Sequence, residues 1–127
     1  LPYLKKSKTD PNIVNISSIA AHNGGGGGSG LYAGAKAAVL TETVSMAKEF
    51  AKYHIRVNSV LPGLIETRFH KTFSTPQRVK QVAKNTPLKR NGTPQDVANA
   101  VLFLASSKAS FITGEYIAVN GGLLMRT

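Results

Sequence analysis

Cysteine and tryptophan are both absent from this chain of 127 residues. Without cysteine there is no disulfide framework and no thiolate chemistry, which fits a cytoplasmic protein. No apolar run approaches the ~18 residues of a membrane-spanning helix, and residues 1–10 lack the architecture of a secretory signal. The three histidines, His22, His54 and His70, lie far apart in the sequence with no thiols near them, so we expect no metal site.

Acidic residues are scarce as well. Sixteen lysines and arginines face only six aspartates and glutamates, which gives a formal net charge of +10. Such an excess is typical of proteins that bind nucleic acids or other anionic surfaces. The basic residues are scattered, however, and no aromatic side chains are interleaved among them as stacking platforms. We therefore expect no nucleic-acid partner, and a basic anion-binding module is the less favoured alternative.

Apolar strand-like runs alternate with helical segments along the chain. The expected strands cover residues 12–17, 55–61 and 116–119, and the expected helices cover 31–53, 76–85 and 95–105. Thr75 and Thr93 each precede a proline, which is typical of an N-cap followed by proline at the first helical position. Alternation of this kind predicts an α/β fold with a parallel sheet, and no linker divides the chain into separate domains.

Six glycines form a low-complexity patch, Gly24 to Gly28 and then Gly30. The spacing of Gly25, Gly27 and Gly30 formally matches a dinucleotide fingerprint. The first glycine of that fingerprint should follow a strand directly, and the next strand should end near an acidic residue; neither holds here. We interpret the patch as a flexible loop beside the substrate, with an engineered linker as the less favoured alternative.

A serine pair, a phenol and an ammonium group are spaced so that they could meet at one carbonyl oxygen. Ser17 and Ser18 end the first expected strand, at the edge where open parallel sheets bind ligands. Tyr32 precedes Lys36 by four residues, which places both on one face of a helix. This spacing alone also fits a half-buried tyrosine beside a lysine whose chain lies along the surface.

At these residues the chain resembles the short-chain dehydrogenase/reductase family, NAD(P)-dependent enzymes with a Rossmann-type fold. The matching segments follow the family order and cover 15–18, 32–36, 56–63, 92–98 and 113–122. Among family members, the sequences of the active-site motifs and of the C-terminal segment are most similar to the 3-oxoacyl-acyl-carrier-protein reductase type.

The resemblance also implies what this sequence does not contain. The family's glycine-rich cofactor turn and its Asn-Asn-Ala-Gly stretch are absent. Residues 1–127 are thus expected to form a single partial domain, the C-terminal half of an NAD(P)-binding Rossmann-type domain with a doubly wound parallel sheet. Its strands would be the last three of seven, and residues 12–17 would pair with a strand outside this chain. The isolated residues are then expected neither to bind NAD(P) tightly nor to catalyse reduction.

The resemblance assigns roles to particular residues. Ser18, with Ser17 as the fallback, would orient the substrate carbonyl, Tyr32 would donate or accept the proton, and Lys36 would also hold the nicotinamide ribose. The remaining cofactor-binding residues, expected near the nicotinamide carboxamide, are Pro62, Gly63, Ile65 and Thr67. By contrast, we expect Asn58 and Asp96 to have structural roles, in the sheet and in helix capping.

The implied function is the interconversion of a carbonyl and an alcohol by hydride transfer with NAD or NADP. The substrate would be a small molecule or an acyl-carrier-linked compound; its identity, the choice of cofactor and the direction of the reaction stay open. An inactive fragment or a non-enzymatic scaffold is the alternative. Ala37, Ala47 and Ala51 form a small-residue stripe that would let helices approach closely, and family members pair this helix, so we expect a homo-oligomer, a dimer or tetramer.

Overall fold

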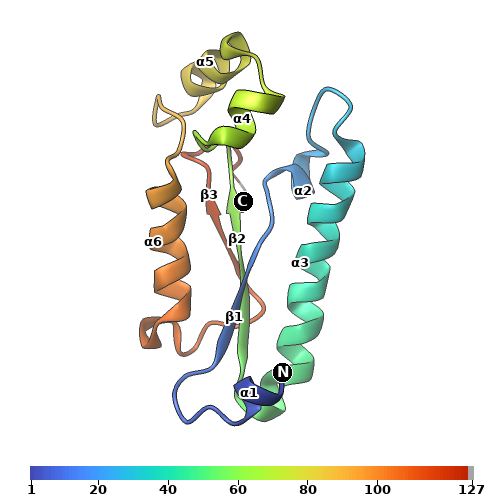
Figure 1. The fold of residues 1–127 in the computed structure, drawn as a ribbon, viewed down its shortest axis with the longest axis vertical. Coiled ribbons are helices and arrows are strands. Elements are labelled where there is room, and N and C mark those ends of the chain that lie inside the picture. Colours follow the sequence, from blue (N-terminus) through green and yellow to red (C-terminus); the bar gives the residue numbers. More distant parts are fainter. Residues whose placement is uncertain (126–127) are drawn as a thin grey trace.

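A three-stranded parallel sheet lies between two long helices in the computed structural model, which describes residues 1–125, without the side chains of 69–71. The strands are β1 (Asn12–Ile16), β2 (Arg56–Pro62) and β3 (Tyr116–Val119), in the order β1-β2-β3. Helix α3 (Gly30–Phe50) covers one face and α6 (Pro94–Ala105) the other (Figure 1). The predicted α/β fold with a parallel sheet is confirmed.

Shorter elements connect these layers. They are α1 (Pro2–Lys5), α2 (Ala20–Asn23), α4 (Arg68–Phe73), α5 (Pro76–Asn85) and two 3₁₀ turns, η1 (Ala51–Tyr53) and η2 (Ser107–Ala109). Five of the six expected elements lie within one residue of their predicted ends. The helix expected over 31–53 ends earlier, at Phe50, and tightens into η1 because His54 takes a left-handed conformation with φ 57°.

The central strand β2 is packed on both sides, since successive side chains of a strand point to opposite faces. Towards α3, Val57 lies in a buried cluster with Ile55 and Ala47. Towards α6, Val60 lies in a second buried cluster with Leu104 and Ala109. The molecule therefore has a core on each face of the sheet, as expected for parallel strands.

The buried face of α3 differs from the apolar stripe that three- and four-residue spacing predicts for this helix, namely Ala37, Leu40, Val44, Ala47 and Ala51. Ala47 is 4% exposed and belongs to the core, whereas Val44 is 41% exposed and Ala51 also faces solvent. Thr43 is buried instead, because its hydroxyl donates to the Val39 carbonyl (2.7 Å) and accepts from the Asn15 amide (2.9 Å). The expected stripe of Ala37, Ala47 and Ala51 is therefore not one exposed face, and that part of the prediction is wrong.

A buried arginine fixes the amino-terminal end of the sheet. Arg56 is 6% exposed, forms a two-bond ion pair with Asp10 (3.1 and 2.7 Å) and donates to the Leu104 carbonyl at 2.9 Å. The hydrogen bond from Arg56 lowers the pKa of the Asp10 carboxyl. Asn58, fully buried, donates to the Ile112 carbonyl at 2.8 Å, so its predicted structural role is confirmed. None of the helices described here is both long and apolar enough to cross a membrane.

Candidate active site

The segments that leave the three strands meet at the carboxyl edge of the sheet. The Ile19 amide, just after β1, donates to the Pro62 carbonyl at the end of β2 over 3.1 Å. The Gly63 amide donates in turn to the Val119 carbonyl at the end of β3 over 2.9 Å. Open parallel sheets bind ligands at this edge, so the predicted residues of both segments lie where a ligand site is expected.

The two serines after β1 have different surroundings. Ser17 is 2% exposed, and its hydroxyl donates to the main-chain carbonyl of Lys36 at 2.7 Å. Ser18 is half-buried, and its hydroxyl oxygen accepts the Ala20 amide at 3.1 Å, a local turn contact just before the short helix α2. Because Ser17 is buried and bonded to the fold, Ser18 is the serine that remains accessible to a substrate.

Tyr32 and Lys36 lie on consecutive turns at the start of α3. The Tyr32 ring is 41% exposed, and the Lys36 ammonium nitrogen is 5.8 Å from the ring centroid. The same nitrogen donates to the main-chain carbonyl of Ile16 over 3.0 Å. Lys36 therefore joins the phenol on α3 to the end of β1, two residues before Ser18.

The segment after β2 is held in an extended form by a second short pairing. Ile65 and Gly92 form a parallel bridge in which Gly92 donates to Leu64 (2.9 Å) and Glu66 donates to Gly92 (2.8 Å). This pattern uses the peptide groups that flank Ile65, so its own N–H and C=O point to the opposite side. Those groups suit a flat amide that needs one donor and one acceptor.

Close packing explains Gly63. A Cβ at this position would lie 3.0 Å from both Cα and Cβ of Asn120, tighter than ordinary contact. Asn120 has little freedom to move, since its side chain donates to the Leu124 carbonyl (2.9 Å) and accepts the Gly122 amide (2.8 Å). The glycine thus lets the end of β2 approach the end of β3, beside Pro62 and ahead of Ile65 and Thr67.

The loop with Gly92 is anchored by a capping box at the start of α6. Asp96 accepts from the Thr93 amide (2.7 Å) and from both terminal nitrogens of Arg90 (2.7 and 2.9 Å). The Arg90 bond, followed by those from Thr93, holds the pKa of the Asp96 carboxyl far below its usual range. The predicted capping role of Asp96 is confirmed, and it positions the strand-like partner of Ile65.

The glycine patch forms the connection from α2 to α3. Gly24 ends α2 in a left-handed conformation, φ 76°, and Ser29 closes the loop by accepting the Gly26 amide at 2.8 Å. An entire helix separates the patch from β1, which agrees with our rejection of the dinucleotide fingerprint. Helix α2 was not predicted from the sequence, although Ser18 has the residue type that begins such turns.

These observations define an open parallel α/β domain with a hydroxyl, a phenol and an ammonium at one edge of its sheet. The family model described as Enoyl-(Acyl carrier protein) reductase matches residues 1–124. The chain is 41% identical over 126 residues to the 3-oxoacyl-[acyl-carrier-protein] reductase of Thermotoga maritima, covering 98% of this chain and 50% of the relative.

Solved structures agree with this match. The ligand-free aldohexose dehydrogenase of Thermoplasma acidophilum superposes with a TM-score of 0.85 at 40% identity, over 99% of this chain and 52% of that one. A 7α-hydroxysteroid dehydrogenase complexed with NADH superposes with a TM-score of 0.83 at 40% identity. The match covers 87% of this chain and 43% of that one. The chain belongs to the short-chain dehydrogenase/reductase family, as predicted, and it spans about half the length of the curated relative it matches.

Proposed function

We propose that these residues carry the substrate and nicotinamide side of an oxidoreductase that interconverts a carbonyl and an alcohol. In this proposal residues 1–127 are the C-terminal half of a Rossmann-type, NAD(P)-binding domain. The observation that carries it is the position of Lys36, which contacts the end of β1 and lies beside the Tyr32 ring. Family membership supports it, since the relatives include reductases and dehydrogenases.

In this site Ser18 orients the substrate by donating its hydroxyl proton towards the carbonyl oxygen. Tyr32 then gives its phenolic proton to that oxygen, or takes it back when the alcohol is oxidised. The Lys36 ammonium lies beside the Tyr32 ring and would hold the cofactor ribose. When bound, NAD(H) or NADP(H) supplies or accepts the hydride.

We assign the nicotinamide carboxamide to the segment after β2. The outward N–H and C=O of Ile65 offer one donor and one acceptor, and Thr67 adds a hydroxyl. Pro62 and Gly63 end β2 and direct this segment across the edge of the sheet. A flat amide group fits such a set of partners, which supports a nicotinamide cofactor.

To test this proposal, the intact protein is incubated with NADH or NADPH and, in turn, with aldehydes, ketones, sugars and acyl-carrier-linked 3-oxo compounds. We expect at least one carbonyl class to be reduced, with loss of the reduced-nicotinamide absorbance. Failure with every class and both cofactors would contradict the function and favour a non-enzymatic scaffold.

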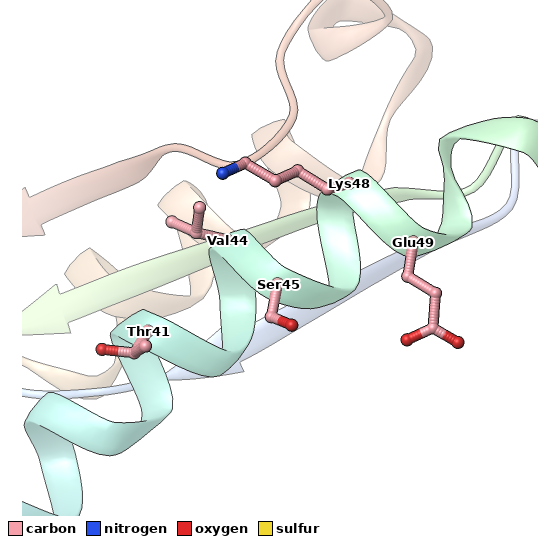
Figure 2. A pocket seen from close by; sticks show the side chains of 5 residues that line it. All are labelled: Thr41, Val44, Ser45, Lys48 and Glu49. Atoms are coloured by element: carbon pink, nitrogen blue, oxygen red, sulfur yellow. The ribbon is translucent and has the colours of Figure 1, made fainter.

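We also propose that the intact protein is a homo-oligomer that pairs through the exposed face of α3. Figure 2 shows this face, a shallow depression lined by Thr41, Val44, Ser45, Lys48 and Glu49. The exposed Val44 lies between the small residues Thr41 and Ser45, which allows a second copy of the helix to approach closely. Lys48 and Glu49 of one subunit can form ion pairs with Glu49 and Lys48 of the other across a two-fold axis. Light scattering should show a dimer or tetramer that Val44→Glu converts to smaller species; an unchanged mass would contradict this surface.

A further inference from the structure

The segment between Glu66 and Asp96 contains seven lysines and arginines and no acidic residue. It covers α4 and α5, which lie at the same end of the molecule as the glycine loop (Figure 1). Seven of the ten net positive charges of the chain therefore fall in this segment. The proposed reaction does not use this charge.

Arg78 is the basic residue placed against the glycine loop. A Cβ at Gly26 or Gly27 would lie 3.6 or 3.5 Å from one or the other terminal nitrogen of its guanidinium. The main chain of the loop thus runs directly beside the guanidinium. Gly26 lacks the left-handed φ of its neighbours, and a Cβ there would make only ordinary contact with the guanidinium.

The Arg78 side chain is exposed, and it forms no ion pair or hydrogen bond with any group in the described part of the chain. Its main-chain amide is held by the Thr75 cap at 3.2 Å, which fixes the first turn of α5. Arg90, by comparison, is neutralised by Asp96 at 2.7 Å. Arg78 therefore presents an uncompensated guanidinium from a fixed helical turn.

The loop that Arg78 contacts joins the two elements with the proposed reacting groups. It follows α2, which begins two residues after Ser18, and it leads into α3, whose first turn carries Tyr32. The guanidinium therefore lies beside the loop that links the segments carrying Ser18 and Tyr32, while the segment assigned to the nicotinamide runs from Pro62 to Thr67. A guanidinium binds carboxylate and phosphate groups through two parallel hydrogen bonds.

We propose that Arg78 is a specificity-determining residue that binds a carboxylate or phosphate group of the substrate beside the glycine loop. The preferred substrates are then anionic carbonyl compounds rather than their neutral analogues. This inference rests on the proposed function and narrows it to a substrate class.

The test compares a keto acid with its neutral ester, acetoacetate and methyl acetoacetate, in the intact protein. Arg78→Met should raise the KM for acetoacetate about 10- to 100-fold, the usual effect of losing a charged hydrogen bond. The kcat for both compounds and the KM for the ester should change little, and Arg78→Lys should restore part of the loss. Lys80→Met, which removes the same charge from the same helix, is the matched control and should leave both KM values unchanged.

Equal changes in the KM for acid and ester, or an equal effect of Lys80→Met on these KM values, would overturn the proposal. Turnover that still depends on Tyr32 would, in that case, leave the proposed function intact. The dissociation constants of NADH and NADPH, measured by fluorescence, should be unchanged in Arg78→Met. A selective loss of cofactor affinity would assign the guanidinium to the dinucleotide phosphates instead and overturn the substrate assignment.

If neither compound is turned over, calorimetric titration with acetoacetate and with inorganic phosphate gives the answer directly. Binding of either anion should weaken at least about 10-fold in Arg78→Met and not in Lys80→Met. Equal affinity in the two variants, or no binding by the unaltered protein, would overturn the proposal.

Discussion

The hydroxyl of Ser17 donates a hydrogen bond to the main-chain carbonyl of Lys36 over 2.7 Å, and the Lys36 ammonium donates to the carbonyl of Ile16 over 3.0 Å. Two bonds in opposite directions thus tie the end of β1 to the second turn of α3. They fix the start of α3, whose first turn carries the phenol, relative to the strand that leads to Ser18. The adjacent serines therefore differ: Ser17 is bonded within the fold, and Ser18 is the one proposed to contact the substrate.

This division predicts opposite effects of two matched alanine substitutions. Ser17→Ala removes a buried hydrogen bond and should lower the free energy of unfolding by about 1–2 kcal/mol. Ser18→Ala should change stability less and turnover more, since its hydroxyl is accessible and proposed to contact the substrate. Urea unfolding and steady-state kinetics on both variants check this prediction. If Ser17→Ala lost more turnover than Ser18→Ala and lost no stability, the roles of the two serines would be reversed.

The buried arginine at the other end of the sheet predicts a large stability effect far from the site. Arg56→Met leaves the Leu104 carbonyl without its buried donor and Asp10 without its partner, and should cost about 3 kcal/mol of unfolding free energy. Arg90→Met breaks an ion pair that is largely exposed and should shift the unfolding midpoint much less. Comparable shifts of the unfolding midpoint in Arg56→Met and Arg90→Met would show that burial does not determine how much each ion pair stabilises the fold.

Acid should weaken the fold partly through Asp96. Its pKa is lowered in the folded protein, so the stabilisation is fully present above the unfolded value of about 3.9 and is lost as pH falls towards the folded value. The difference in unfolding midpoint between the unaltered protein and Asp96→Asn should thus be constant near neutral pH and narrow below about pH 4. A difference that stays constant in strong acid would contradict the pairing with Arg90 and Thr93.

Much of this fold follows from local signals in the sequence. The Thr-Pro pairs gave the starts of α5 and α6 because each threonine side chain accepts a main-chain amide three residues later. The β-branched runs predicted β1 and β2. The order of the strands in the sheet, β1-β2-β3, is also their order in the chain. Family motifs, rather than periodicity, selected Tyr32 and Lys36 from other tyrosine and lysine pairs.

The rest depends on contacts between distant segments. The sequence pattern placed Val44 in the buried stripe, but the hydroxyl of Thr43 bonds to Asn15 on β1 and so takes the buried position. The pairing of Ile65 with Gly92 and the approach of Arg78 to the glycine loop likewise join residues far apart in the chain. No local propensity encodes such pairs, so sequence reasoning missed them.

The assignment of Tyr32 as the proton-transferring group is the central claim, and one substitution tests it most directly. Tyr32→Phe in the intact protein keeps the ring and removes only the hydroxyl, and the loss of acid–base assistance should lower kcat at least ~10²-fold. The dissociation constants for NADH and NADPH, measured on the same preparation, should change little. Turnover close to that of the unaltered protein would contradict the assignment.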